Sequence, residues 1–174
     1  TGSCSCPPVA AAVSAILDQC SRFIQALPPD VYTRTSQSIK GGTIGKHVRH
    51  TVDHFAAALA CLDTRQPIDY DRRSREVPME TAPAVAIQAI DALRRRVESL
   101  DDRALRGPVQ IQVMLTADGA EATLDSSLGR ELHFAFHHAV HHHAMLKAIA
   151  CEFGVEPAPE FGLAPSTLNY VKSK

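Results

Sequence analysis

The sequence lacks a long uninterrupted hydrophobic run, although 45% of its 174 residues are hydrophobic. A helix that spans a membrane needs about 20 consecutive apolar residues, so we expect no membrane partner. The first residues also lack the basic and then apolar pattern of a secretory signal peptide. Together, these absences predict a soluble, cytoplasmic protein.

The sequence also lacks an excess of charge of one sign. Its formal net charge is -1, from 18 Lys and Arg and 19 Asp and Glu. A protein that binds nucleic acid usually carries a basic face that neutralises phosphates, whereas basic residues here form only short runs such as residues 94–96. We therefore expect a small-molecule substrate and no nucleic-acid partner.

Cysteine is scarce, with five residues in a chain that is long enough to bury a core without disulfides. Cys20, Cys61 and Cys151 lie within stretches of helical periodicity, where a reduced and mostly buried thiol is the usual state. We therefore expect free thiols, in a single domain that spans residues 1–174.

Four stretches have the apolar spacing of an amphipathic helix. They cover residues 9–27, 44–62, 83–100 and 131–153, and the third begins at residue 81 or 83. Each stretch carries a narrow apolar stripe, and four such stripes can be buried only against one another. We therefore predict an all-α fold with four main helices.

The segments between these stretches are less regular. Residues 109–115 alternate apolar and polar side chains, which is typical of a strand, and a turn at Asp118-Gly119 joins them to residues 122–124 in a minor β-hairpin. Residues 63–82 are polar and contain Pro78, which predicts a long connection. We expect the tail after residue 154 to be mostly coil, with one turn after Pro165.

Six of the nine histidines lie within residues 131–153. At about 100° per residue, one narrow stripe of this helix contains Phe134, His138, His142, Met145 and Ile149, with His141 at its edge. The other three histidines, His133, His137 and His143, point elsewhere.

This stripe predicts a metal site. His138 and His142 stand at i and i+4, so both rings project in the same direction. Imidazoles on a core-facing apolar stripe need polar partners, and a metal ion is one such partner. The alternative is that histidine is simply abundant here, with some rings solvated and others hydrogen-bonded in the core.

A second group of histidines lies on the predicted helix at residues 44–62. His47, His50 and His54 are spaced three and four apart on the flank of its apolar stripe. One helix rarely supplies three ligands in a tetrahedral arrangement, so a second helix with histidines strengthens the metal hypothesis. Periodicity leaves the choice among the three open, with a preference for His47 or His54, which lie nearer the core.

Two motifs carry a resemblance to the DinB/YfiT-like superfamily. The run H-T-V-D from His50 matches the H-x-x-D of that family's second helix, and the run H-A-V-H-H from His138 matches the H-x-x-H-H of its late helix. The resemblance spans most of the chain. It implies a four-helix bundle with a long crossover, and metal ligands at His50, His138 and His142. The surplus histidines His47, His54 and His141 stay open as additional or substitute ligands.

The resemblance also implies a function. Three neutral imidazoles leave an open position on an ion, as in a catalytic site, and zinc or nickel suits such ligands. Relatives that resemble this chain include thiol-dependent S-transferases and isomerases. Our leading hypothesis is therefore metal-dependent transfer or addition of a low-molecular-weight thiol to a small electrophilic substrate. Arg73 and Arg75 are the residues that we expect to bind the thiol. Family habit and apolar positions near residues 109–115 suggest a homodimer.

Two alternatives stay open. A metal-dependent hydrolase would use metal-bound hydroxide, with His54 or His141 as the catalytic base. A non-catalytic metal-binding or stress-associated protein would store or sense the ion. A base beside the open position favours the hydrolase, an apolar funnel beside basic residues favours a thiol cosubstrate, and a site sealed from solvent favours the third hypothesis.

Overall fold

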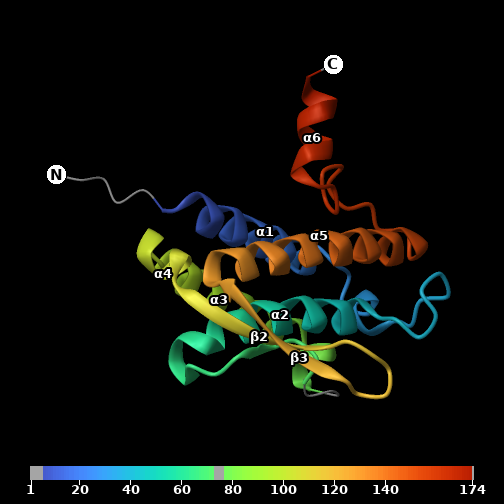
Figure 1. The fold of residues 1–174 in the computed structure, drawn as a ribbon. Helices are drawn as coiled ribbons and strands as arrows, with labels where there is room; N and C mark the ends of the chain where they lie inside the picture. The colour runs from blue at the N-terminus through green and yellow to red at the C-terminus, as the bar shows by residue number, and fades with distance from the viewer. Residues whose placement is uncertain (1–5, 73–76, 174) are drawn as a thin grey trace.

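The computed structural model describes residues 6–72 and 77–173. Its longest helices are α1 (Pro8–Gln25), α2 (Ile44–Thr64), α3 (Pro83–Glu98) and α5 (Leu128–Glu152). Figure 1 shows α1 and α5 side by side, with α2 packed along α5. α1 and α2 each contact both α3 and α5, so the four helices enclose one space. The prediction of a mostly helical chain is confirmed.

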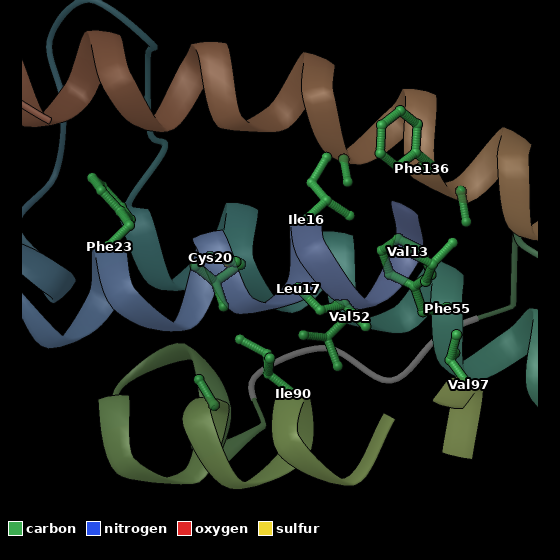
Figure 2. Close-up of a cluster of buried hydrophobic side chains, with 14 of the residues drawn as sticks. Val13, Ile16, Leu17, Cys20, Phe23, Val52, Phe55, Ile90, Val97 and Phe136 are labelled. Carbon is green, nitrogen blue, oxygen red and sulfur yellow. The ribbon is translucent and has the colours of Figure 1, made fainter. Parts of the chain in front are cut away.

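Apolar side chains from all four helices fill this space. Figure 2 shows Leu17 of α1, Phe55 of α2, Ile90 of α3 and Phe136 of α5 within one cluster. Phe55 and Ile90 have no exposed surface. Fully burying a side chain of this size stabilises the fold by about 1.5–3 kcal/mol, so these stripes drive the packing of the helices.

Capping residues set the ends of the two helices that carry histidines. At the start of α2, the Thr43 hydroxyl accepts a hydrogen bond from the Lys46 amide at 3.1 Å. At the start of α5, the Ser127 hydroxyl accepts one from the Arg130 amide at 3.3 Å. α5 ends at Glu152, just before Gly154, whose φ of 77° suits a helix C-terminus.

The predicted hairpin is present, but it belongs to a three-stranded sheet of order β1-β2-β3. β2 (Pro108–Met114) runs antiparallel to β3 (Glu121–Ser127), and the short strand β1 (Ile68–Asp69) pairs parallel with β2. β1 contacts α2 and β3 contacts α5. The prediction of two strands was therefore incomplete, because a strand of two residues is too short to show alternation.

Two short helices accompany the four long ones. α4 (Asp102–Arg106) is capped by the Asp101 carboxylate, which accepts a hydrogen bond from the Ala104 amide at 2.7 Å. α6 (Pro165–Lys172) begins where we predicted one turn and extends over eight residues, whereas residues 155–164 form no helix. α6 has no buried residue and stands away from the other helices in Figure 1. Among the described helices, none combines the length and the apolar character that crossing a membrane requires.

The cysteines only partly follow the expectation of buried thiols. Cys6, Cys20, Cys61 and Cys151 are free. Burial raises the pKa of the Cys20 thiol to about 12, so this thiol stays protonated. Cys61 is half-buried, whereas Cys151 is exposed on the outer face of α5.

The connection between α2 and α3 contains β1 and the 3₁₀ helix η2 (Pro78–Glu80). η2 lies against the first turn of α2, and the lack of a side chain on Gly45 makes this close approach possible. A Cβ atom there would stand only 1.9 Å from the Glu80 carbonyl oxygen. The Glu80 carboxylate also forms an ion pair with Arg49 Nε at 2.8 Å. These contacts fix η2 at the end of α2 where the histidines begin.

The loop before α2 is tied to the end of α5 by one carboxylate. Glu152 accepts hydrogen bonds from the Gln37 amide at 2.8 Å, the Ser36 hydroxyl at 2.7 Å and the Ser38 amide at 3.1 Å. These hydrogen bonds favour the charged form and lower the pKa of Glu152 to about 2. These hydrogen bonds hold residues 36–38 against the C-terminal end of α5.

Glu152 makes the stability of the fold depend on pH. Because its pKa is below the ordinary value of 4.5, the carboxylate stabilises the fold above pH 4.5, and this contribution is lost as the pH falls toward 2. We expect Glu152→Gln to unfold at lower urea concentration than the wild type at neutral pH, with a smaller difference near about pH 3. Glu156→Gln is the matched control. Equal stability of Glu152→Gln and the wild type at neutral pH would contradict this role.

Candidate metal centre

Three histidines from two helices meet where α2 packs on α5. His50 on α2 and His138 and His142 on α5 each offer a ring nitrogen, and these nitrogens all lie within 4.8 Å of one another. The closest pair is His138 Nε2 and His50 Nε2, at 2.9 Å. The three ring centroids are 4.5, 4.6 and 4.8 Å apart. The structure thus brings together the three residues that the resemblance implies; we call them the histidine cluster.

The histidine cluster fits one metal ion by spacing and by charge. On a tetrahedral zinc ion, nitrogen ligands lie about 3.3 Å apart, which falls between the shortest distance of 2.9 Å and the upper limit of 4.8 Å. Burial, followed by the neighbouring histidines, lowers the pKa of His142 to about 2, so this ring is neutral. A neutral imidazole has the lone pair that a metal needs, and three converging lone pairs can hold one divalent cation.

The other two histidines of α2 pack on the histidine cluster. His54 is buried and stacks on His138, with ring centroids 3.9 Å apart. Its Nδ1 lies 2.9 Å from the His50 carbonyl oxygen, and because a carbonyl only accepts, Nδ1 carries the proton. His47 Nδ1 lies 3.0 Å from His142 Nδ1. The structure therefore groups His50 with the α5 pair and places His47 and His54, which periodicity preferred, around it.

The histidine stripe on α5 borders the buried face of this helix. The buried residues of α5 include Leu132, Ala139 and Leu146, whereas Phe134 is exposed and His138 is half-buried. The prediction that Phe134 and His138 face the core was therefore wrong, because the buried face of α5 is rotated about the helix axis from the predicted stripe. The apolar ring of Phe134 packs beside the site and stacks on His138, with centroids 6.2 Å apart.

His143 lies outside the histidine cluster, as expected from its position off the stripe, but it points into the core. It is buried, its ring stacks on Phe161 at 4.6 Å, and its Nδ1 lies 3.2 Å from the Gln19 side-chain oxygen. Burial lowers the pKa of His143 to about 3, so the ring is neutral. His143 is a hydrogen-bonded core residue, whereas His133 and His137 are exposed.

The residues predicted to act in catalysis and thiol binding lie at different places. His54 is buried against the histidine cluster, whereas His141 is exposed, with its ring centroid 5.3 Å from that of His142. Arg73 and Arg75 lie outside the described residues. The roles of all four stay predictions.

Tyr70 and Glu131 extend the site, and sequence reasoning missed both. The Tyr70 ring stacks on His54 at 5.1 Å, and its hydroxyl donates to the buried Glu131 carboxylate at 2.9 Å. The Ser126 hydroxyl donates to the other Glu131 oxygen at 2.6 Å. Burial, followed by the Glu131 charge, raises the pKa of Tyr70 far above its usual range. Neither of the two motifs includes them, because the contact between Tyr70 and Glu131 joins positions 61 residues apart.

The Tyr70 hydroxyl can be removed without losing the ring. In Tyr70→Phe, the buried Glu131 loses one of its two hydroxyl donors, so we expect the free energy of unfolding to fall by about 1–3 kcal/mol. Urea unfolding measures this change. Tyr170→Phe, on the exposed surface of α6, should change it by less than about 0.5 kcal/mol. An unchanged stability of Tyr70→Phe would show that the hydrogen bond to Glu131 contributes nothing.

The fold and the histidine cluster define a helical protein whose histidines can hold a metal ion. Residues 9–146 match the family described as the DinB superfamily. The match extends from α1 into α5 and includes His50, His138 and His142. The chain belongs to the DinB superfamily, and the resemblance drawn from its two motifs is confirmed.

A curated protein of Rhizopus delemar, described as FK506-binding protein 5, is also similar to this chain. The two are 35% identical over 108 residues, which cover 62% of this chain and 28% of that protein. The chain thus spans little more than a quarter of that relative's length. The name describes that protein as a whole and gives no function for the matched part.

Proposed function

We propose that the protein is a metal-dependent enzyme in which His50, His138 and His142 hold one divalent ion. The observation that carries this proposal is the convergence of three nitrogens from two helices within 4.8 Å. Imidazole ligands suit zinc or nickel, and three protein ligands leave a position for a substrate. When bound, such an ion acts as a Lewis acid and lowers the pKa of a thiol or a water molecule.

In this proposal, the four long helices are the four-helix bundle with a long crossover that the resemblance implies. The contacts of α1 and α2 with both α3 and α5 support this arrangement. The ligands then lie along one of its contacts, between α2 and α5. Contacts between His47 and His142 and between His50 and His138 indicate that these helices run antiparallel.

The reaction that we propose is transfer or addition of a low-molecular-weight thiol to a small electrophilic substrate. A cleft of about 290 Å³ beside the histidine cluster supports it, because His50 and His142 line this cleft together with Lys40 and Lys46. Positive charge near the ion favours a thiolate over a thiol. Both lysines are exposed, so the cleft is open to solvent and differs from a sealed site that only stores an ion.

Hydrolysis is the second candidate, and the position of His54 favours it. In the neutral form of His54, the hydrogen bond to the His50 carbonyl keeps the proton on Nδ1, so the lone pair is on Nε2. A general base needs such a lone pair close to the reacting atoms. Ester hydrolysis in the absence of any thiol, lost in His54→Ala with metal content unchanged, would favour this candidate over thiol transfer.

Metal content tests the ligand assignment. His50→Ala, His138→Ala and His142→Ala each remove one of three donors, so bound metal should fall well below one ion per chain. The measurement is elemental analysis of protein purified without a histidine tag. The same variants should melt at lower temperature, because a bound ion stabilises the folded state by mass action.

His133→Ala is the matched control, because His133 is exposed on the same helix and lies outside the histidine cluster. It should keep the metal content of the wild type. His143→Ala is unsuitable, since that ring is buried in the core. Full metal occupancy in both His138→Ala and His142→Ala would refute the proposed site.

We also propose that two copies associate through the β2–β3 hairpin. Met114, Leu115 and Leu124 are 50%, 62% and 48% exposed in and beside these strands. Leu124 lies on β3, which is an edge strand, and an exposed apolar residue on an edge strand is typical of an interaction surface.

Sedimentation velocity tests this association. The wild type should sediment as a dimer, whereas Leu124→Lys should shift it toward the monomer, because the substitution places a charge in the proposed contact. Leu163→Lys, at an exposed leucine far from the hairpin in sequence, is the control. A wild-type monomer at high concentration would exclude the proposed dimer.

A further inference from the structure

The cleft beside the histidine cluster is lined by positively charged side chains. It is formed by residues 39–42 and the first two turns of α2, together with His142. Three of its residues, Lys40, Lys46 and Arg49, carry a positive charge, and none of the described residues that line it is acidic. Two members of the histidine cluster therefore share a small cleft with three cations.

These three cations differ in their partners. Arg49 is buried and forms ion pairs with Asp53 at 2.9 Å and Glu80 at 2.8 Å, so acidic groups of the protein balance its charge. Lys46 Nζ donates only to the Gly41 carbonyl, at 3.0 Å, among the described residues. Within this part of the chain, no ion pair joins Lys40 or Lys46 to a carboxylate. Two positive charges at the cleft are thus available to a ligand.

The loop that carries Lys40 is held in place from two sides. Glu152 at the end of α5 binds its first part through residues 36–38. Its last residue, Gly42, lies close to His47: a Cβ atom on Gly42 would stand 3.1 Å from His47 Nε2. His47 in turn contacts His142 at 3.0 Å. The lysines therefore have a fixed place relative to the histidine cluster.

We propose that this cleft is an anion subsite, in which Lys40 and Lys46 bind the carboxylate or phosphate group of a small ligand whose thiolate reaches the ion. This inference rests on the proposed function, because it takes the open side of the ion to face the cleft. The volume of about 290 Å³ is at the lower end for small-molecule sites, so it suits a short ligand. Lysine binds either anion as a point charge.

Binding of three short thiols to the cobalt(II)-loaded protein tests the subsite. Cobalt replaces zinc at nitrogen ligands, and its absorption spectrum changes when a thiolate binds. The thiols 3-mercaptopropionate, 2-mercaptoethanol and cysteamine carry a negative, no and a positive charge at the end remote from sulfur. We expect 3-mercaptopropionate to bind about tenfold more tightly than 2-mercaptoethanol at low salt, and cysteamine to bind most weakly. High salt should reduce the difference.

The variant Lys40→Gln/Lys46→Gln removes both charges and preserves most of the side-chain length. It should bind 3-mercaptopropionate about tenfold more weakly than the wild type, with little change for 2-mercaptoethanol. Lys172→Gln on α6 is the matched control and should keep the preference. Competition by inorganic phosphate and by succinate separates the two anion classes, and displacement of 3-mercaptopropionate by neither would overturn the subsite.

Cobalt content, measured on the same samples, separates two kinds of failure. Full cobalt content without a preference for the anionic thiol would overturn the subsite and leave the proposed metal site intact. A preference that survives in the double variant would do the same. A wild-type protein that binds no cobalt, zinc or nickel would overturn both proposals.

Discussion

The packing of α2 against α5 is the interaction on which the histidine cluster depends. His50 comes from one helix and His138 and His142 from the other, so their nitrogens meet only while the two helices stay in contact. Imidazoles placed together at the edge of a core do not hold helices together by themselves, because each ring loses water. Burial of apolar side chains such as Phe55 and Leu146 supplies the attraction, and the polar rings occupy the border of the core that it creates.

Local features of the sequence predicted most of the fold. Apolar periodicity located the four long helices, because a helix depends on residues close in the chain. β1 could not be predicted, since its two residues form a strand only by pairing with β2, far along the sequence. The rotation of α5 was hidden for another reason: an apolar side chain beside a polar site, such as Phe134, has the same pattern as one in the core.

The site was predictable to a similar extent. The i and i+4 spacing identified His138 and His142, but the choice of His50 over His47 and His54 came from the family resemblance. All three rings of α2 lie within contact of the α5 histidines, and differences of an ångström or two between them are beyond any periodicity argument. The polar contacts of Glu131 and of Glu152 were equally inaccessible, because their partners lie in other segments of the chain.

The tie between Glu152 and the loop before α2 has a consequence for selectivity. It joins the loop that carries Lys40, and that Lys46 contacts through the Gly41 carbonyl, to α5, the same helix that supplies two members of the histidine cluster. In the proposed subsite, the lysines would bind the anion of a ligand and the ion would bind its sulfur, at a distance that the fold fixes. The fixed distance between the lysines and the ion would then select ligands by length. A ligand one methylene too short or too long would reach either the lysines or the ion, but not both.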